Sequence, residues 1–82
     1  MEIKDLASIL DLYYEFGKER KDRNALIQCF GIKYADFIIK NKIKPEEIIE
    51  KSTLKNTQYA KELRKGIKLA NYVCLKEDFI LP

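Results

Sequence analysis

Residues 24–42 have the sequence NALIQCFGIKYADFIIKNK, and their apolar side chains recur with the spacing of an α-helix rather than of a strand. One face of this predicted helix carries Leu26, Ile27, Phe30, Tyr34, Phe37 and Ile38. A second apolar group lies nearly opposite and comprises Ala25, Ile32, Ile39 and Ile43. A helix that is apolar on two sides is expected at the centre of its own bundle or in contact with a neighbour.

The sequence on either side of this segment predicts three further helices. Polar breaks near residues 17–24, 44–47 and 52–56 separate them, and no hairpin dipeptide such as Asn-Gly occurs. Pro45 followed by two acids is typical of a helix start. We therefore expect an all-α fold in one domain, residues 1–82. It is a small bundle of three long helices (about 3–18, 24–42 and 56–76) plus one short helix (about 45–52).

The composition indicates a globular protein that is neither disordered nor membrane-spanning. The 82 residues carry a net charge of +3, with 46% hydrophobic and 35% charged residues, and no apolar run is long enough for a membrane span. The start, MEIKDLASIL, lacks the basic region and cleavage site of a secretory signal. Cys29 and Cys74 are the only cysteines, which favours a reducing cytoplasm with both thiols buried; one disulfide stays open if their helices touch.

The absence of histidine excludes most catalytic and metal-binding templates. No His-dependent triad can form, two distant cysteines cannot hold zinc, and three isolated glycines make no phosphate-binding loop. The acid pairs Asp11/Glu15 and Glu46/Glu50 are typical of hydrated helix faces, with a divalent ion or a basic partner as alternatives. We therefore expect a non-enzymatic protein without catalytic residues, cofactor or metal ion.

The first predicted helix has more apolar surface than a single core stripe needs. Ile9, Leu12 and Phe16 extend the stripe sideways. Because a chain of this size buries only about 60% of its unfolded surface, spare apolar side chains are most simply covered by a partner or a second copy. We expect these three residues to form a protein interface, with a symmetric homodimer as one form of it.

The last predicted helix has a basic outer face opposite a core stripe that ends at Cys74. This face carries Lys61, Arg64, Lys65, Lys68 and Tyr72. Residues 2–19 have a net charge of −3, whereas residues 51–76 have a net charge of +6. The basic face could bind an acidic partner protein or the phosphates of a nucleic acid, or it could simply be a hydrated helix exterior.

Two resemblances concern the region around Gly31. Residues 26–37 are similar to a helix-turn-helix motif in the apolar residues that flank the glycine, although Ile27 stands where a small residue normally lies. The simpler interpretation makes Gly31 a close-packing point or a kink in one long helix. Residues 25–70 also resemble a SAM domain, without its usual early tryptophan, which implies protein–protein association. That resemblance is carried by Phe30-Gly31-Ile32, Tyr34, Asn41, Ile43 and Thr53-Leu54-Lys55.

The leading hypothesis is a small cytoplasmic protein-binding module that acts through exposed helix faces. An adaptor, an inhibitor or an antitoxin-like regulator would fit, and a phage or mobile-element origin suits the size and composition. The alternative is a nucleic-acid-binding protein that uses the basic face of the last helix, with dimerisation as an option. Neither hypothesis involves a membrane.

Overall fold

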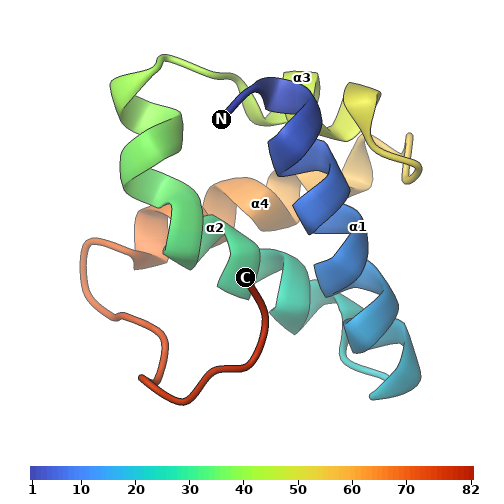
Figure 1. The fold of residues 1–82 in the computed structure, drawn as a ribbon, viewed down its shortest axis with the longest axis vertical. Helices are drawn as coiled ribbons and strands as arrows, with labels where there is room; N and C mark the ends of the chain where they lie inside the picture. Colours follow the sequence, from blue (N-terminus) through green and yellow to red (C-terminus); the bar gives the residue numbers. More distant parts are fainter.

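The computed structural model describes residues 1–82 and contains four helices and no strand (Figure 1). The helices are α1 (Ile3–Glu19), α2 (Arg23–Lys40), α3 (Pro45–Lys51) and α4 (Gln58–Leu69). The predicted bundle of three long helices and one short helix is confirmed, and the first three helices end within two residues of their predicted bounds. No helix combines the length and the apolar character that crossing a membrane requires.

All four helices contribute to one hydrophobic core. At its centre, the buried rings of Tyr13 and Phe30 meet edge to face with their centroids 5.4 Å apart. Such a contact adds to the free energy that burying the two rings already provides. The core residues are Leu6, Ala7, Leu10, Tyr13, Leu26, Ile27, Phe30, Ile38, Ile48, Ile49, Ala60 and Leu63.

Helices α2 and α4 cross where two glycines face each other's backbone. A Cβ atom on Gly31 would lie 2.7 Å from the Leu63 carbonyl oxygen, and one on Gly66 would lie 2.2 Å from the Gln28 carbonyl oxygen. Both contacts are too short for real Cβ atoms, and the opposing atoms belong to backbone that cannot easily move. Gly31 is therefore a close-packing point inside one continuous helix, as the simpler interpretation predicts, and the residues that resemble a helix-turn-helix motif do not form one.

The last helix is shorter than predicted. It ends at Leu69 instead of residue 76, and the N–H groups of Ala70, Asn71 and Tyr72 bond back to carbonyls of its final turn. The remaining residues form a tail that returns across α2 (Figure 1). There the Phe79 ring stacks on Tyr13, with ring centroids 5.8 Å apart, and the Tyr34 hydroxyl donates to the Pro82 carbonyl. Phe79 and Leu81 of the tail thus pack against the core, where a longer α4 would not bring them.

This early end also changes the surroundings of the cysteines. Cys74 lies in the tail and is exposed, whereas Cys29 in α2 is half-buried against the core. Both are free thiols. The expectation of two buried thiols is therefore wrong for Cys74.

Candidate functional site

Helix α3, a six-residue connection and helix α4 form a compact helix–turn–helix unit. The Ser52 hydroxyl ends α3 by donating to the Ile49 carbonyl, at 2.6 Å, and it accepts the N–H of Leu54 at 3.1 Å. At the start of α4, the Asn56 side-chain oxygen accepts the N–H of Gln58 at 3.0 Å. These short local bonds are typical of helix ends and fix the direction in which α4 leaves the turn.

Two longer-range contacts stabilise this unit, one to α1 and one between its own two helices. The Asp11 carboxylate of α1 accepts hydrogen bonds from the N–H and the hydroxyl of Thr53, at 3.1 and 2.9 Å. Arg64 of α4 pairs with Glu46 of α3, and its hydrogen bond lowers the pKa of Glu46. Asp11 and Glu46 each belong to an acid pair noted in the sequence, so each pair has one member that makes a contact within the fold.

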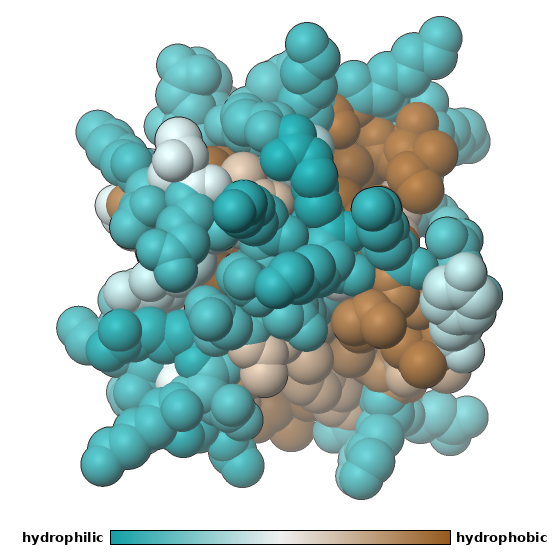
Figure 2. Space-filling view, turned by 180° about the vertical axis from the view of Figure 1, so that it is seen from behind, coloured by the Kyte–Doolittle hydropathy of each residue, from teal (hydrophilic) through white to brown (hydrophobic).

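The outer face of α4 carries three lysines that point away from the core. Lys61, Lys65 and Lys68 are all exposed, and together with Gln58 we call them the α4 strip. Lys65 lies 3.3 Å from Glu62, while Lys61 and Lys68 have no acidic partner. Figure 2, which views the side behind α1 and α2, shows hydrophilic side chains across most of this face and apolar ones along one edge.

Glu62 lies at the seam between α4 and α2. It is only 8% exposed, and it accepts a hydrogen bond of 2.7 Å from the Gln28 side-chain nitrogen. This bond, with Lys65 nearby, lowers the pKa of Glu62. The Glu62 carboxylate therefore contacts both Gln28 and Lys65, and it offsets part of the positive charge of the α4 strip, while Lys61 and Lys68 form no ion pair.

The predicted basic surface is divided by the structure. Lys61, Lys65 and Lys68 share the outward side of α4, whereas Arg64 leans toward α3 to meet Glu46. Tyr72 is 84% exposed but lies beyond the end of α4, in the tail. The predicted helix, continued to residue 76, placed Tyr72 beside the lysines, but α4 ends before Tyr72.

The predicted protein interface lies on α1. Leu12 is 52% exposed, whereas Ile9 and Phe16 are half-buried and pack against the core. The Arg20 guanidinium covers the Phe16 ring at 4.9 Å from its centroid. Other exposed apolar side chains lie outside α1, near the carboxyl end of α2 (Ile39), at the end of α4 (Leu69) and in the tail (Val73 and Ile80).

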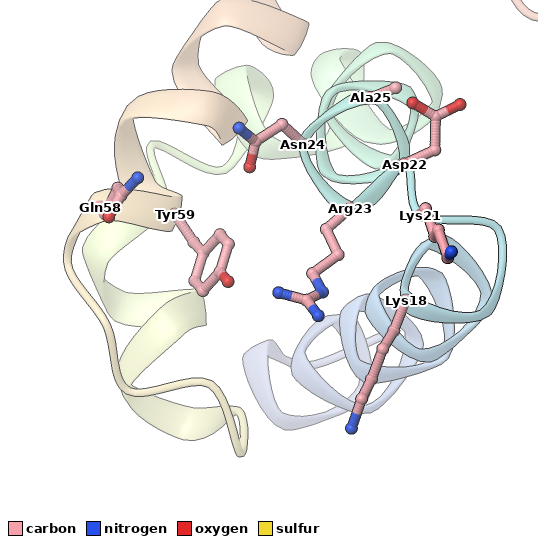
Figure 3. Close-up of a pocket in the computed structure, with 8 residues that line it drawn as sticks. All are labelled: Lys18, Lys21, Asp22, Arg23, Asn24, Ala25, Gln58 and Tyr59. Atoms are coloured by element: carbon pink, nitrogen blue, oxygen red, sulfur yellow. The ribbon is translucent and has the colours of Figure 1, made fainter.

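A second group of cations surrounds a pocket at the turn between α1 and α2 (Figure 3). Lys18, Lys21 and Arg23 line it from one side, and Gln58 and Tyr59 of α4 line it from the other. The sequence had indicated only a charged turn here, because the α4 residues that complete the pocket are distant in the chain. No group of three or more His, Cys, Asp or Glu side chains is placed to hold a metal ion.

A comparison with known families agrees with this helical arrangement. A family model described as an HTH-like domain matches residues 2–76, so the chain belongs to this family of helix-turn-helix-like domains. No curated protein and no solved structure matches the chain. The match spans all four helices, and α3, the connection and α4 are one helix–turn–helix arrangement within it, whereas the region around Gly31 is continuous helix.

Proposed function

We propose that this protein binds duplex DNA through the α4 strip. Membership of the HTH-like family supports a DNA-binding type of domain. The observation that carries the proposal is the pair of unpartnered lysines, Lys61 and Lys68, on the second helix of the α3–α4 unit. In helix-turn-helix proteins the second helix enters the major groove and its amino-terminal residues contact the bases.

The chemistry of the α4 strip suits this role. Lysine neutralises phosphates, and the Gln58 amide at the first turn of α4 can bond to base edges. Helix α4 is 12 residues long, which gives it about three turns along a groove. The excess of acidic residues on α1 would then disfavour binding through that helix and orient the domain on a polyanion.

A mobility-shift experiment with a generic duplex tests the proposal. Wild-type protein should bind at low salt and bind far more weakly at moderate salt, because association releases counterions from the phosphates. The variant Lys61→Glu/Lys68→Glu should lose the shift at low salt. The control Lys4→Glu/Lys76→Glu removes the same charge from exposed sites outside the α4 strip and should keep binding. Absence of wild-type binding at low salt would overturn the proposal.

A protein contact is the second candidate function, and a groove beside α4 supports it. Ile39, Ile43 and Ile67 line a cavity of about 230 Å³ whose rim carries Lys42 and Lys68. An apolar floor with a basic rim fits an acidic amphipathic segment of another protein. The contact predicted on α1 through Ile9, Leu12 and Phe16, including a homodimer, remains a prediction.

Light scattering separates these two protein contacts. Leu12→Asp should lower the mass of a complex formed through α1, and Ile39→Asp should lower that of one formed through the groove. A monomeric wild type that binds no protein would contradict both. The proposal assigns no catalytic activity to the chain, and a cytoplasmic location remains a prediction.

A further inference from the structure

The pocket at the α1–α2 turn has a volume of about 550 Å³ and brings together parts of three helices. Its polar lining includes Lys18 from the end of α1, Lys21 from the turn, Arg23 and Asn24 from the start of α2, and Gln58 from the start of α4. In Figure 3 the Arg23 side chain extends toward the centre of the pocket, between Tyr59 and Lys18.

The tight turn forces these cations together. Lys21 adopts a left-handed backbone conformation with φ of 59°, and the N–H of Asp22 bonds to the Gly17 carbonyl at 2.7 Å. A Cβ atom on Gly17 would lie 2.9 Å from the Arg23 Cα atom, so only glycine lets the start of α2 approach α1 this closely. A non-glycine residue such as lysine rarely adopts a positive φ, so the backbone at Lys21 is strained.

The positive charge of the pocket is not neutralised within the fold. Lys18, Lys21 and Arg23 form no ion pair. Asp22 is the one acid in the lining, and in Figure 3 its carboxylate points away from Arg23 and Tyr59. A cluster of three cations with no partner raises the free energy of the fold slightly and favours an anion at this position.

The start of α2 adds to this potential. Asp22 makes no side-chain capping bond, and no acidic residue lies in the first turn of α2. The backbone N–H groups of Arg23, Asn24 and Ala25 have no acceptor within the fold. Helix starts normally attract acids, whereas this one has Arg23 at its first position.

A contact with an aromatic ring favours this position of the Arg23 side chain before any ligand arrives. Its guanidinium lies 5.9 Å from the centroid of the Tyr14 ring, and Tyr14 meets the Tyr59 ring edge to face at 5.4 Å. A guanidinium restrained in this way loses little conformational freedom when it binds an oxyanion.

We propose that this pocket binds a backbone phosphate of the DNA that lies along the α4 strip. The inference rests on the proposed function. Gln58 connects the two regions, because it lines both the pocket and the polar surface that contains Lys61 and Lys65. A DNA strand that passes along α4 can therefore reach Arg23 without leaving the protein surface. The pocket positions the duplex, and residues of α4 contact the bases.

The salt dependence of duplex binding tests this inference. Fluorescence anisotropy at several salt concentrations gives the slope of log K against log salt, which changes by about 0.9 for each phosphate contact. The variant Lys21→Gln/Arg23→Gln should reduce the slope by about 1 to 2 and weaken binding equally for different duplex sequences. The single variant Lys18→Gln, which leaves the turn intact, should reduce the slope by up to about 1.

The matched control is Lys4→Gln/Lys76→Gln, which removes two exposed charges elsewhere. Its slope should equal that of the wild type. If the pocket variants also keep the wild-type slope while Lys61→Glu/Lys68→Glu loses binding, the inference is overturned and the proposed function stands.

A second readout separates a phosphate site from DNA binding itself. Inorganic phosphate added to isotopically labelled wild-type protein should shift the amide NMR signals of Arg23 and Asn24 saturably, and should not do so in Lys21→Gln/Arg23→Gln. Saturable shifts without any duplex binding would mean that the pocket binds free phosphate only. That result would overturn both the assignment of the pocket to a DNA phosphate and the proposed function. The absence of shifts, combined with an unchanged slope, would remove the pocket as a phosphate site.

Discussion

The inner face of α4 buries Ala60, Leu63 and Gly66, of which Leu63 and Gly66 meet the α2 backbone, whereas the outer face exposes Lys61, Lys65 and Lys68 to solvent. The residues of the inner face are buried, and at Gly66 the α2 backbone leaves no room even for a methyl group. On the outer face two of the three lysines lack an acidic partner. One 12-residue helix thus carries residues that the fold requires and residues that it does not.

This difference between the two faces indicates which residues of α4 are candidates for a functional role. Like charges three or four residues apart on a helix cost a few tenths of a kcal/mol each. Lys61, Arg64, Lys65 and Lys68 have this spacing, and of these four only Arg64 and Lys65 have an acidic partner to offset the repulsion. Residues that do not stabilise the fold are the ones free to serve a ligand.

The largest effect is expected on the inner face. Gly66→Ala should lower the free energy of unfolding by about 3 kcal/mol, because the new methyl group would meet the Gln28 backbone and force α2 and α4 apart. Urea denaturation measures this change. Lys61→Ala in the same helix should shift stability by no more than about 0.5 kcal/mol. Equal stabilities for the two variants would remove the contrast between the faces.

A smaller, pH-dependent effect is expected at the seam. The hydrogen bond from Gln28 lowers the pKa of Glu62, so its stabilisation is present above the ordinary glutamate pKa of about 4.3 and is lost as the pH falls through the lowered value. When the pH is lowered from about 5 to about 3, the free energy of unfolding should therefore fall by about 1 kcal/mol less in Glu62→Gln than in the wild type. Urea denaturation at each pH gives the difference, and the exposed Glu77→Gln serves as control. Parallel pH profiles for wild type and Glu62→Gln would contradict the role of this carboxylate.

The smallest effect is expected on the outer face, and it has the opposite sign. Lys61→Gln/Lys68→Gln should leave stability unchanged or raise it by about 0.5 kcal/mol at low salt, since like-charge repulsion is relieved. Thermal unfolding at low and high salt should show this gain shrinking as salt screens the charges. A clear loss of stability would mean that the lysines hold the fold, and would weaken their assignment to a ligand.

Helical periodicity was sufficient to predict the bundle but not the end of α4. Ala70 and Cys74 continue the spacing of Leu63 and Ile67, and no proline or glycine stands between Ile67 and Leu81 to stop the helix. The tail instead packs Phe79 on Tyr13 and Leu81 on the core, which a continued helix would carry away from these contacts. These contacts include one across more than 60 residues of chain, which a local pattern does not contain.

The site was predicted in part for the same reason. The wheel of α4 placed Lys61, Lys65 and Lys68 on one side, as they are in the structure. It could not predict that Arg64 would pair with Glu46, or that Gln58 would complete a pocket with Arg23. Both depend on how the helices pack. For Gly31, the close approach to Leu63 decided between one helix and two.

The most direct test of DNA binding by the α4 strip is an amide NMR titration of the full chain with a short duplex at low salt. We predict that the largest shifts fall on Gln58, Lys61, Lys65 and Lys68, with a second group at Arg23 and Asn24, and that α1 around Leu12 stays unchanged. Shifts confined to Ile9, Leu12 and Phe16, or no shifts at all, would contradict the account.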